Sequence, residues 1–205
     1  MILSDRDIRL HLKSGKIRID PAPILEEQLG SCSIDLHLGN TFKIFNHSKY
    51  PYIDPRNPSI SKELMKEISV PGSEAFIMRP GEFCLAITEE SIALADDLLG
   101  RLEGRSSLGR LGIIVHSTAA RVDPGWEGKI VMELGNIGVM PVALYPGMRI
   151  CSLTFEQVST VVDNPYAKRK SSKYVNQDAP LASKLSDEMS VEPRYVKHGK
   201  KAVRI

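Results

Sequence analysis

Residues 104–110, with the sequence GRSSLGR, bring together groups that suit an anionic ligand. The segment offers the backbone N–H groups of a turn, the hydroxyls of Ser106 and Ser107, and the guanidinium groups of Arg105 and Arg110. Donors of this kind at the start of a helix are what a triphosphate needs. A Ser-Ser pair is equally a plain helix N-cap, and Arg105 could equally form a structural ion pair. For this segment alone, both interpretations stay open.

A tight turn is predicted at Asp123-Pro124-Gly125, and Trp126, the single tryptophan of the chain, follows it. Turn geometry explains Asp, Pro and Gly without any function. An indole just beyond such a turn can also serve as a platform for a sugar or a base. The turn is therefore a second candidate segment for ligand binding.

The third candidate is Glu133, the lone carboxylate in the apolar run of residues 130–134. Val131 shares a strand face with Glu133, and Met132 lies on the other face. Apolar residues on both faces predict a strand that is buried on both sides. A buried carboxylate must be paired, protonated or functional. Glu133 is therefore a candidate general acid and base, and an ion pair with a nearby arginine is the alternative.

The first element expected around these residues is a short N-terminal helix. Ser4 and Asp7 have the spacing of an N-terminal cap, and the apolar Ile8 and Leu12 follow four residues apart. Gly15 suits the end of the helix.

A strand pattern with a period of two follows. Apolar and polar residues alternate over residues 34–38, and Gly39-Asn40 is predicted to turn the chain into a second strand at residues 42–44. Prolines predict a loop over residues 46–60. A short helix is predicted over residues 62–68.

From Gly72 onwards, turn signals recur about every ten residues, which favours an all-β sandwich or barrel over alternating strands and helices. A short helix at residues 106–111 is the one helical interruption expected there. From about residue 163 the chain becomes polar and loses its periodicity. The turn signals are Pro71-Gly72, Pro80-Gly81, Asp123-Pro124-Gly125 and Pro146-Gly147.

The composition of the 205 residues, 42% hydrophobic and 25% charged, is that of an ordinary globular domain. No apolar run approaches the roughly eighteen residues of a transmembrane helix. Acidic residues stand near the N-terminus, where a signal peptide needs basic ones. These features predict a cytoplasmic protein without a membrane partner.

The cysteines, Cys32, Cys84 and Cys151, lie far apart in apolar-rich segments, which predicts reduced, buried thiols. The sequence holds no CxxC, HExxH or HxE motif, and its five histidines do not cluster with the cysteines. No structural or catalytic zinc site is therefore predicted, and no metal ligand is assigned.

Charge is unevenly divided along the chain. Residues 163–205 hold ten Lys/Arg and five Asp/Glu, whereas the rest of the chain holds 17 and 20. A basic tail can recruit phosphate or nucleic acid, but such tails are usually only solvated, and that interpretation is favoured for residues 186–205. The tail offers few aromatic platforms for stacking on bases, so no nucleic-acid partner is predicted.

Taken together, these segments resemble the dCTP deaminase family, part of the trimeric dUTPase-like superfamily, and within it the monofunctional, dUTP-forming bacterial type. A GRSSLxR loop followed at this distance by an Asp-Pro-Gly-Trp turn is specific in combination. The likeness covers roughly residues 1–185 as one domain, and residues 186–205 look like a mobile C-terminal extension. The matching stretches are residues 32–39 (CSIDLHLG), 104–110, 116–126 (HSTAARVDPGW), 129–133 and 166–177 (YAKRKSSKYVNQ).

The resemblance implies a mainly β fold, a distorted, jelly-roll-like β-barrel of the dUTPase-like kind with a short N-terminal helix and a few small helices. It implies a homotrimer with active sites at the subunit interfaces, and a tail from about residue 163 that closes over the nucleotide. The implied reaction is hydrolysis of dCTP to dUTP and ammonia without zinc. Mg²⁺ would arrive with the triphosphate, and dTTP is a candidate inhibitor.

By the same resemblance, Glu133 takes a proton from water and delivers it to the base and then to the leaving ammonia, while Ser106 and Arg110 support the reacting groups. Asp123 would receive the sugar 3′-hydroxyl. The residues that the resemblance places around the nucleotide are Arg105, Ser106, Ser107, Leu108, Gly109, Arg110, Asp123, Val131, Met132, Glu133, Tyr166, Lys173 and Gln177.

Two alternatives remain. Bifunctional relatives that form dUMP tend to carry Gln-Thr-Ala-Gly followed by an aromatic residue, whereas residues 117–121 here read STAAR, which favours dUTP as the product. Ala120 stands where enterobacterial-type deaminases carry a histidine, so any role of that side chain is missing. The alternative from another class is a non-catalytic nucleotide-binding protein, which would not turn over dCTP.

Overall fold

The structure is a computed structural model, and it describes residues 1–46, 52–55 and 64–189. The chain divides into two compact units, of which the first comprises residues 1–45 and 67–181 and the second residues 46–66 and 182–205. Every residue predicted to line the nucleotide belongs to the first unit. The single domain predicted over residues 1–185 stays a prediction.

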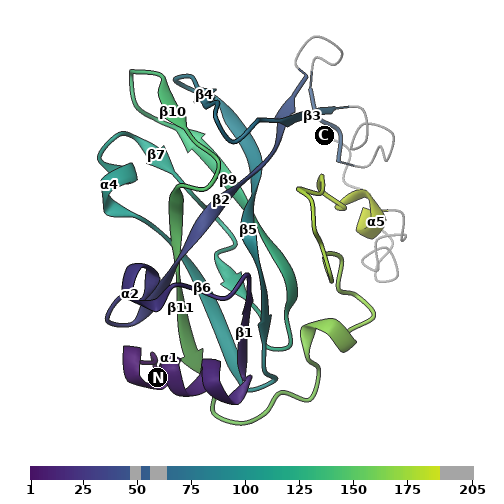
Figure 1. Cartoon of the computed structure of the whole chain (residues 1–205). Coiled ribbons are helices and arrows are strands. Elements are labelled where there is room, and N and C mark those ends of the chain that lie inside the picture. The colour runs from purple at the N-terminus through teal and green to yellow at the C-terminus, as the bar shows by residue number, and fades with distance from the viewer. Residues whose placement is uncertain (47–51, 56–63, 190–205) are drawn as a thin grey trace, which may run out of the picture. The chain divides into compact units, whose positions relative to one another are not determined.

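One curled sheet organises the first unit (Figure 1). Among the described residues it has nine strands in the order β7-β9-β5-β2-β11-β6-β8, with β1 beside β5 and β3 beside β2. A separate two-stranded sheet pairs β10 with β4. The strands are β1 (Ile17–Asp20), β2 (Ser33–Phe45), β3 (Met65–Ser69), β4 (Phe76–Met78), β5 (Phe83–Leu94), β6 (Leu98–Gly104), β7 (Ile113–Ile114), β8 (Arg121–Val122), β9 (Glu127–Asn136), β10 (Val142–Leu144) and β11 (Arg149–Gln157).

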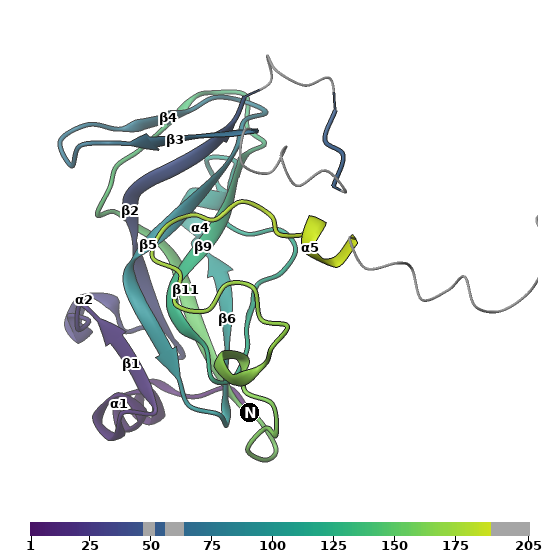
Figure 2. The ribbon, with the colours of Figure 1, turned by 90° about the vertical axis from the view of Figure 1, so that its right-hand side faces the viewer.

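The sheet curls because its two longest strands change neighbours along their length. Residues 33–37 of β2 pair with β11, whereas residues 38–44 pair with β5. Residues 91–94 of β5 in turn pair with β1. Figure 2 shows these strands bending from one pairing to the next. The result is a mainly β half-barrel with few helices, and the predicted fold class is confirmed.

A single hydrophobic core backs the sheet. Ile34, Leu36 and Leu38 alternate along β2 with half-buried residues and are fully shielded from solvent, as the period of a strand requires. Phe42 stacks on Phe76 with ring centroids 4.4 Å apart. Burying each such side chain stabilises the fold by about 1.5–3 kcal/mol, so the core holds the strands in register.

The predicted N-terminal helix is confirmed as α1 (Asp5–Ser14). The Ser4 side chain accepts a hydrogen bond from the Asp7 N–H at 3.3 Å. Gly15 ends the helix with a left-handed φ of 76°, and its N–H donates to the Leu12 carbonyl. Ile8 is completely buried, so α1 is fixed to the first unit by its apolar side.

The turn predicted at Gly39-Asn40 is wrong, because β2 runs unbroken through it. Gly39 is needed there for space, since a Cβ on it would lie 2.9 Å from the carbonyl oxygen of Ile87 on β5. The pairing of β2 with β5 also shifts register beyond Leu38, as at a β-bulge. Gly39 therefore marks a close approach of two strands, which the sequence alone does not distinguish from a turn.

The short helix predicted over residues 62–68 is wrong where the structure describes it. Residues 65–69 form β3, which pairs with β2, and Lys43 of β2 faces Glu67 with 3.4 Å between Nζ and Oε2. Residues 62 and 63 lie outside the described residues. Local helix propensity is a weak prior, and the hydrogen-bonding groups that β2 offers override it.

The burial of β9 also differs from the prediction of two covered faces. Met132 and its neighbours on that face are buried, whereas Val131 and Glu133 are half-buried. Alternation identifies the residues that share a face, but not which faces another layer covers. Within one chain, Glu133 therefore stands on an accessible face.

The helix predicted at residues 106–111 is confirmed as the shorter α4 (Ser106–Gly109). The other small helices are α2 (Leu25–Gln28), η1 (Tyr166–Lys168) and, in the second unit, α5 (Ser186–Met189). Of the loop predicted over residues 46–60, the described residues 46 and 52–55 carry neither helix nor strand. The C-terminal extension predicted to be mobile comprises residues 186–205, and residues 190–205 of it lie outside the described residues.

Candidate active site

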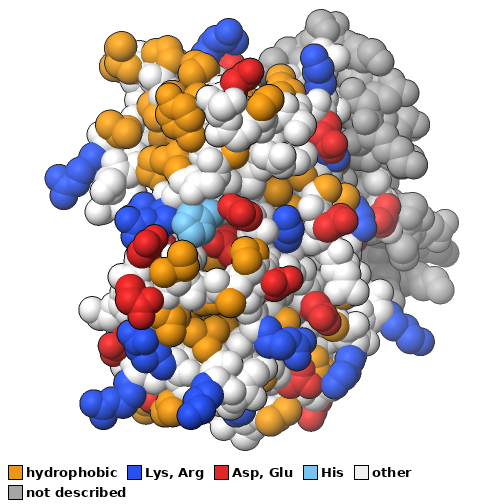
Figure 3. Space-filling model, in the orientation of Figure 1, with side chains coloured by type: hydrophobic (Ala, Val, Ile, Leu, Met, Phe, Trp, Pro, Cys, Tyr) orange, Lys and Arg blue, Asp and Glu red, His pale blue; other side chains and the backbone are white. Residues whose placement is uncertain are grey.

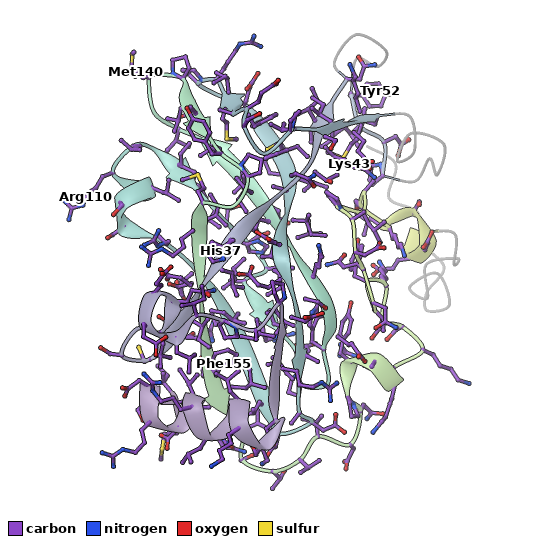
Figure 4. All side chains as sticks on the ribbon, viewed as in Figure 1. His37, Lys43, Tyr52, Arg110, Met140 and Phe155 are labelled. Carbon is purple, nitrogen blue, oxygen red and sulfur yellow. The ribbon has the colours of Figure 1, made fainter. Side chains whose placement is uncertain are left out.

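α4 follows the end of β6 and presents three of the predicted phosphate ligands to solvent. Ser106, Ser107 and Arg110 are exposed, and in the described part of the chain their side chains make no hydrogen bond or ion pair. Figure 4 shows Arg110 extending outward from α4. These donors are therefore available to an external anion.

Arg105, the residue before α4, is directed towards the sheet instead. Its Nη2 lies 3.2 Å from Asp35 Oδ2, and its Nη1 donates to the Arg149 carbonyl at 3.0 Å. This is the structural ion pair that the sequence left open. Nucleotide contact by Arg105 stays a prediction.

Two other predicted site residues belong to the core. The side chains of Leu108 and Met132 are buried, so only their backbones can face a ligand. Gly109 is exposed beside Leu108, and Val131 is half-buried beside Met132. At Leu108, Gly109 and Met132 the predicted nucleotide contacts would therefore be made by the backbone. The half-buried Val131 could also use its side chain.

Glu133 projects from the half-buried face of β9 and has one described partner. Thr118, in the segment between β7 and β8, donates from Oγ1 to Glu133 Oε2 at 3.1 Å. A neutral donor of this kind fixes the orientation of a carboxylate while its other oxygen stays able to bond. The arrangement suits a group that exchanges protons with a ligand.

Asp123 is held between two arginines. Arg121 Nε donates to Oδ1 and Arg169 Nη2 to Oδ2, each at 2.7 Å. Arg121 comes from β8 and Arg169 from the tail, so this carboxylate joins two distant segments. The predicted 3′-hydroxyl contact of Asp123 is not tested by this geometry.

The tail packs on the turn through aromatic rings. Tyr166 lies against Trp126, with ring centroids 5.0 Å apart, and the guanidinium of Arg169 lies 5.1 Å from the Tyr166 centroid. The Tyr166 N–H also donates to the Pro124 carbonyl at 2.8 Å. In this state Trp126, the predicted platform, supports Tyr166.

Further along the tail, Gln177 is buried against β9. The Lys129 N–H donates to the Gln177 carbonyl at 2.9 Å, and the Gln177 amide donates from Nε2 to the Lys129 carbonyl at 3.0 Å. Lys173 is half-buried between these anchor points. Both residues therefore lie on a tail that returns to the strand carrying Glu133 (Figure 2).

Within one chain the predicted site residues form three groups: the α4 turn, Glu133 with Thr118, and Asp123 with the tail. Across the described residues, no hydrogen bond or ion pair joins the side chains of Ser106, Ser107 or Arg110 to the other two groups. Among the described residues, no hydrogen bond or ion pair of these side chains therefore links the α4 turn to Glu133.

Sequence analysis did not identify two residues that contact the predicted site residues. Thr118 lies in the family-matching stretch HSTAAR and Arg169 in YAKRKSS, but no neighbouring residue in either stretch indicates what their side chains contact. Their partners, Glu133 and Asp123, are 15 and 46 residues away in the chain. Such pairings come from the fold and not from local spacing.

The described residues contain no group of three or more His, Cys, Asp or Glu side chains that could hold a metal ion. Burial raises the pKa of the Cys84 thiol to about 12, and burial also raises the pKa of the Cys151 thiol. Both thiols are therefore protonated near neutral pH and poor metal ligands. The burial predicted for all three cysteines is confirmed for these two and is wrong for Cys32, which is exposed. The donors around α4 fit a phosphate, and Mg²⁺ would be held by the phosphates and water.

Comparison with known proteins shows to which family this chain belongs. The family model described as dCTP deaminase-like matches residues 2–158. The chain belongs to the dCTP deaminase-like family. This confirms the family resemblance of the GRSSLGR and Asp-Pro-Gly-Trp segments.

Named relatives of the family match nearly the whole chain. A protein named dCTP deaminase from Thermomicrobium roseum is 60% identical over 192 residues, which is 94% of this chain and 98% of the relative. A protein named dCTP deaminase, dUMP-forming, from Dictyoglomus thermophilum is 51% identical and covers 91% of this chain and 95% of the relative. Relatives with both names therefore resemble this chain.

The fold is shared with a solved structure of the family. The crystal structure of a 2′-deoxycytidine 5′-triphosphate deaminase from Agrobacterium tumefaciens matches with a TM-score of 0.58 at 23% identity, over 76% of this chain and 47% of that one. At this identity the match supports the fold alone. Among the described residues, no helix is long and apolar enough to cross a membrane.

Proposed function

We propose that this protein is a dCTP deaminase, an enzyme that hydrolyses the 4-amino group of dCTP to give dUTP and ammonia. The observation that carries the proposal is Glu133 on the half-buried face of β9, oriented by Thr118, in a chain of the dCTP deaminase-like family. The 60% identity to a protein named dCTP deaminase supports dCTP as the substrate.

Glu133 is the proton carrier of the proposed reaction. It accepts a proton from water as the water oxygen attacks C4 of the cytosine, and it passes that proton to N3. In the tetrahedral intermediate, Glu133 then accepts the proton of the new hydroxyl and delivers it to the amino group. The C4–N bond breaks, ammonia leaves, and the C4 carbonyl of uracil remains.

The α4 turn supplies the positive and hydrogen-bonding groups of the proposed site. The exposed Arg110 guanidinium and the Ser106 hydroxyl suit the triphosphate and the charge that develops during attack. Mg²⁺, bound to phosphate oxygens and water, would lower the charge of the triphosphate. The reaction itself is proposed to need no zinc.

The tail forms the proposed cover of the nucleotide. Tyr166, Lys173 and Gln177 lie on a segment anchored at Pro124, Asp123 and Lys129. A segment held at a few points next to a site can open and close as nucleotide enters and leaves. Asp123 would exchange an arginine contact for the sugar hydroxyl when nucleotide binds.

The site is proposed to be completed between subunits of a homotrimer. Support comes from the lack, among the described residues, of any hydrogen bond or ion pair between the side chains of Ser106 or Arg110 and Glu133, and from an exposed apolar patch beside α4. Figure 3 shows hydrophobic side chains gathered over the end that holds β4 and β10. Large exposed patches of this kind mark contact surfaces. The exposed side chains are Ile77, Leu111, Ile137, Val139 and Met140.

The product separates this enzyme from its bifunctional relatives. Incubation with dCTP and Mg²⁺, followed by chromatography, should yield dUTP and one ammonia per dCTP. Appearance of dUMP and pyrophosphate instead would assign the activity named for the Dictyoglomus relative. Unchanged dCTP under conditions where the protein binds it would leave a non-catalytic nucleotide-binding protein. Addition of dTTP to the same assay tests it as an inhibitor.

A further inference from the structure

Asp35 lies at the centre of a cluster of hydrogen-bond donors on the solvent-facing side of β2. Its Oδ1 accepts from the Ser152 hydroxyl at 2.6 Å, and its Oδ2 lies 3.2 Å from Arg105 Nη2 and 3.5 Å from Arg149 Nη1. The Asp35 side chain is only 16% exposed. Three donors from other strands and turns therefore converge on one partly buried carboxylate.

The register of the sheet explains this convergence. β2, β11 and β6 are neighbours, and Asp35 pairs with Ser152, which pairs with Glu103. Paired residues of antiparallel strands point to the same face. Asp35 therefore faces the end of β6, from which Arg105 leaves two residues after Glu103.

Arg105 converts this position into an anchor for α4. One end of its guanidinium meets Asp35, and the other donates to the Arg149 carbonyl at 3.0 Å. The carbonyl of Arg105 accepts the N–H groups of Leu108 and Gly109, each at 3.0 Å. The same residue is thus tied to the sheet by its side chain and to α4 by its backbone.

The backbone beneath Asp35 is itself fixed. The Gln28 amide donates to the Asp35 carbonyl at 2.9 Å and to Glu90 Oε1 at 3.3 Å, and the His37 N–H donates to Glu90 Oε2 at 2.9 Å. Glu90 is 2% exposed, and Figure 4 shows His37 part-way along β2. A satisfied buried network of this kind rigidifies its surroundings.

The two arginines of the loop therefore differ in their roles. Arg105 is bound inward, whereas Arg110 is exposed and has no side-chain partner among the described residues. We infer that Asp35 is a positioning residue: it holds Arg105, Arg105 fixes the start of α4, and α4 then presents Ser106 and Arg110 in one orientation to the substrate. The inference rests on the proposed function and assigns the substrate phosphates to Arg110 instead of Arg105.

The test compares Asp35→Asn, Arg105→Lys and the double variant in the dCTP assay. Asp35→Asn removes the charge that holds Arg105, and Arg105→Lys keeps the positive charge but loses the two-ended bridge. A misplacement of about 1 Å at a reacting group can cost about 10²-fold in rate. Each single variant should therefore lose about 10- to 100-fold in kcat, and KM should rise with it, because Ser106 and Arg110 are carried by the same turn and are misplaced together.

The double variant decides whether the two residues act as one unit. It should be no more than about 3-fold slower than the slower single variant, because the second change removes nothing further. Multiplied losses, or Asp35→Asn with the kcat of the wild type, would overturn the inference. A raised KM with unchanged kcat in Arg105→Lys would assign Arg105 to the phosphates and overturn it as well.

Glu156→Gln is the matched control, because Glu156 pairs with Arg101 at 3.1 Å across β11 and β6, away from α4. It should keep the activity of the wild type. Amide hydrogen exchange at Leu108 and Gly109 gives a readout that needs no activity. Exchange there should speed up in Asp35→Asn, and in Arg105→Lys if Asp35→Asn does not fold, but not in Glu156→Gln.

The outcomes separate the inference from the proposed function. Unchanged exchange at Leu108 and Gly109 in both variants refutes the anchoring, whatever the activity. Faster exchange in a protein whose wild type does not convert dCTP refutes the proposed function, and the positioning role in catalysis is withdrawn with it.

Discussion

Gly128 and Gln177 lie so close that a Cβ on Gly128 would stand 2.9 Å from the Gln177 nitrogen and 3.0 Å from its carbonyl oxygen. Gly128 also has a φ of +129°, which an L side chain rarely adopts. The tail can therefore cross β9 at this point only because the residue is a glycine. The position of the tail, and with it Lys173 and Tyr166, depends on this crossing.

Gly128→Ala should loosen the tail and weaken the binding of dCTP. The added methyl group pushes the Gln177 backbone away and breaks its bonds to Lys129. Cleavage by trypsin within residues 168–173 should become faster in the variant, and KM for dCTP should rise about 10-fold, the equivalent of about 1.4 kcal/mol. Limited proteolysis with and without dCTP and Mg²⁺ checks the first effect, and steady-state kinetics the second.

Gly147→Ala controls for backbone strain. Gly147 has a φ of +80°, but nothing lies within 4 Å of the Cβ position. Its substitution should lower stability through strain and leave tail cleavage and KM unchanged. Equal effects of both substitutions on the tail would mean that the crossing at Gly128 does not hold it.

Local signals were sufficient for the elements whose hydrogen bonds are local. Ser4 and Gly15 bound α1 because a capping side chain and a left-handed glycine act within a few residues of the helix. The recurring turn signals gave the mainly β class for the same reason. Gly39 was misinterpreted because its neighbour, Ile87 of β5, is 48 residues away in the chain, and one residue type serves both turns and close packing.

The sequence allowed us to predict which residues of the site are chemically suitable, but not which residues their side chains contact. Glu133 and the α4 residues were identified because a carboxylate in an apolar run and hydroxyls in a Gly/Arg turn are unusual patterns. The inward ion pair of Arg105 with Asp35 depends on the register of β2, β11 and β6. Long-range register is not encoded in spacing, so the different roles of Arg105 and Arg110 needed the structure.

The ion pair of Lys16 with Asp97 should make stability depend on pH. The hydrogen bond from Lys16 lowers the pKa of Asp97 below its ordinary value. A lowered carboxyl pKa contributes stability above the unfolded value of about 3.9, and that contribution is lost as pH falls through the folded pKa.

Asp97→Asn should therefore lower Tm at pH 7 by about 2–4 °C, for a pair worth about 1 kcal/mol at this exposure. The difference from the wild type should shrink as pH falls below about 4. Thermal melts over a pH series measure it. A difference that grows in acid would show the opposite linkage and contradict the lowered pKa.

Activity should survive exhaustive removal of zinc. The described residues lack a cluster of metal ligands, and burial keeps the Cys84 and Cys151 thiols protonated. After treatment with a strong chelator and return of Mg²⁺, turnover of dCTP should match that of untreated enzyme. Stoichiometric zinc in the active protein, with loss of turnover on its removal, would contradict the proposed chemistry.

Glu133→Gln should abolish deamination and leave the binding of dCTP largely intact. The amide keeps the size and hydrogen bonding of the side chain but cannot carry a proton, so kcat should fall by about 10²- to 10⁴-fold. Product chromatography measures turnover, and calorimetry measures binding. Full turnover by this variant would remove Glu133 from the mechanism.

Thr118 should act on catalysis through Glu133. Its hydroxyl donates to Glu133 Oε2 at 3.1 Å, and a hydrogen bond to a charged group contributes about 1.5–3 kcal/mol. Thr118→Val keeps the shape and removes the donor, so kcat should fall about 10-fold or more, because the carboxylate is no longer held towards the substrate. Thr118→Ser restores the hydroxyl and should recover most of the loss.

In a Glu133→Gln background, Thr118→Val should have almost no further effect on turnover, since the group that it orients no longer carries a proton. If valine and serine lower kcat equally, the role of Thr118 is in packing, and its hydrogen bond to Glu133 does not contribute to the reaction.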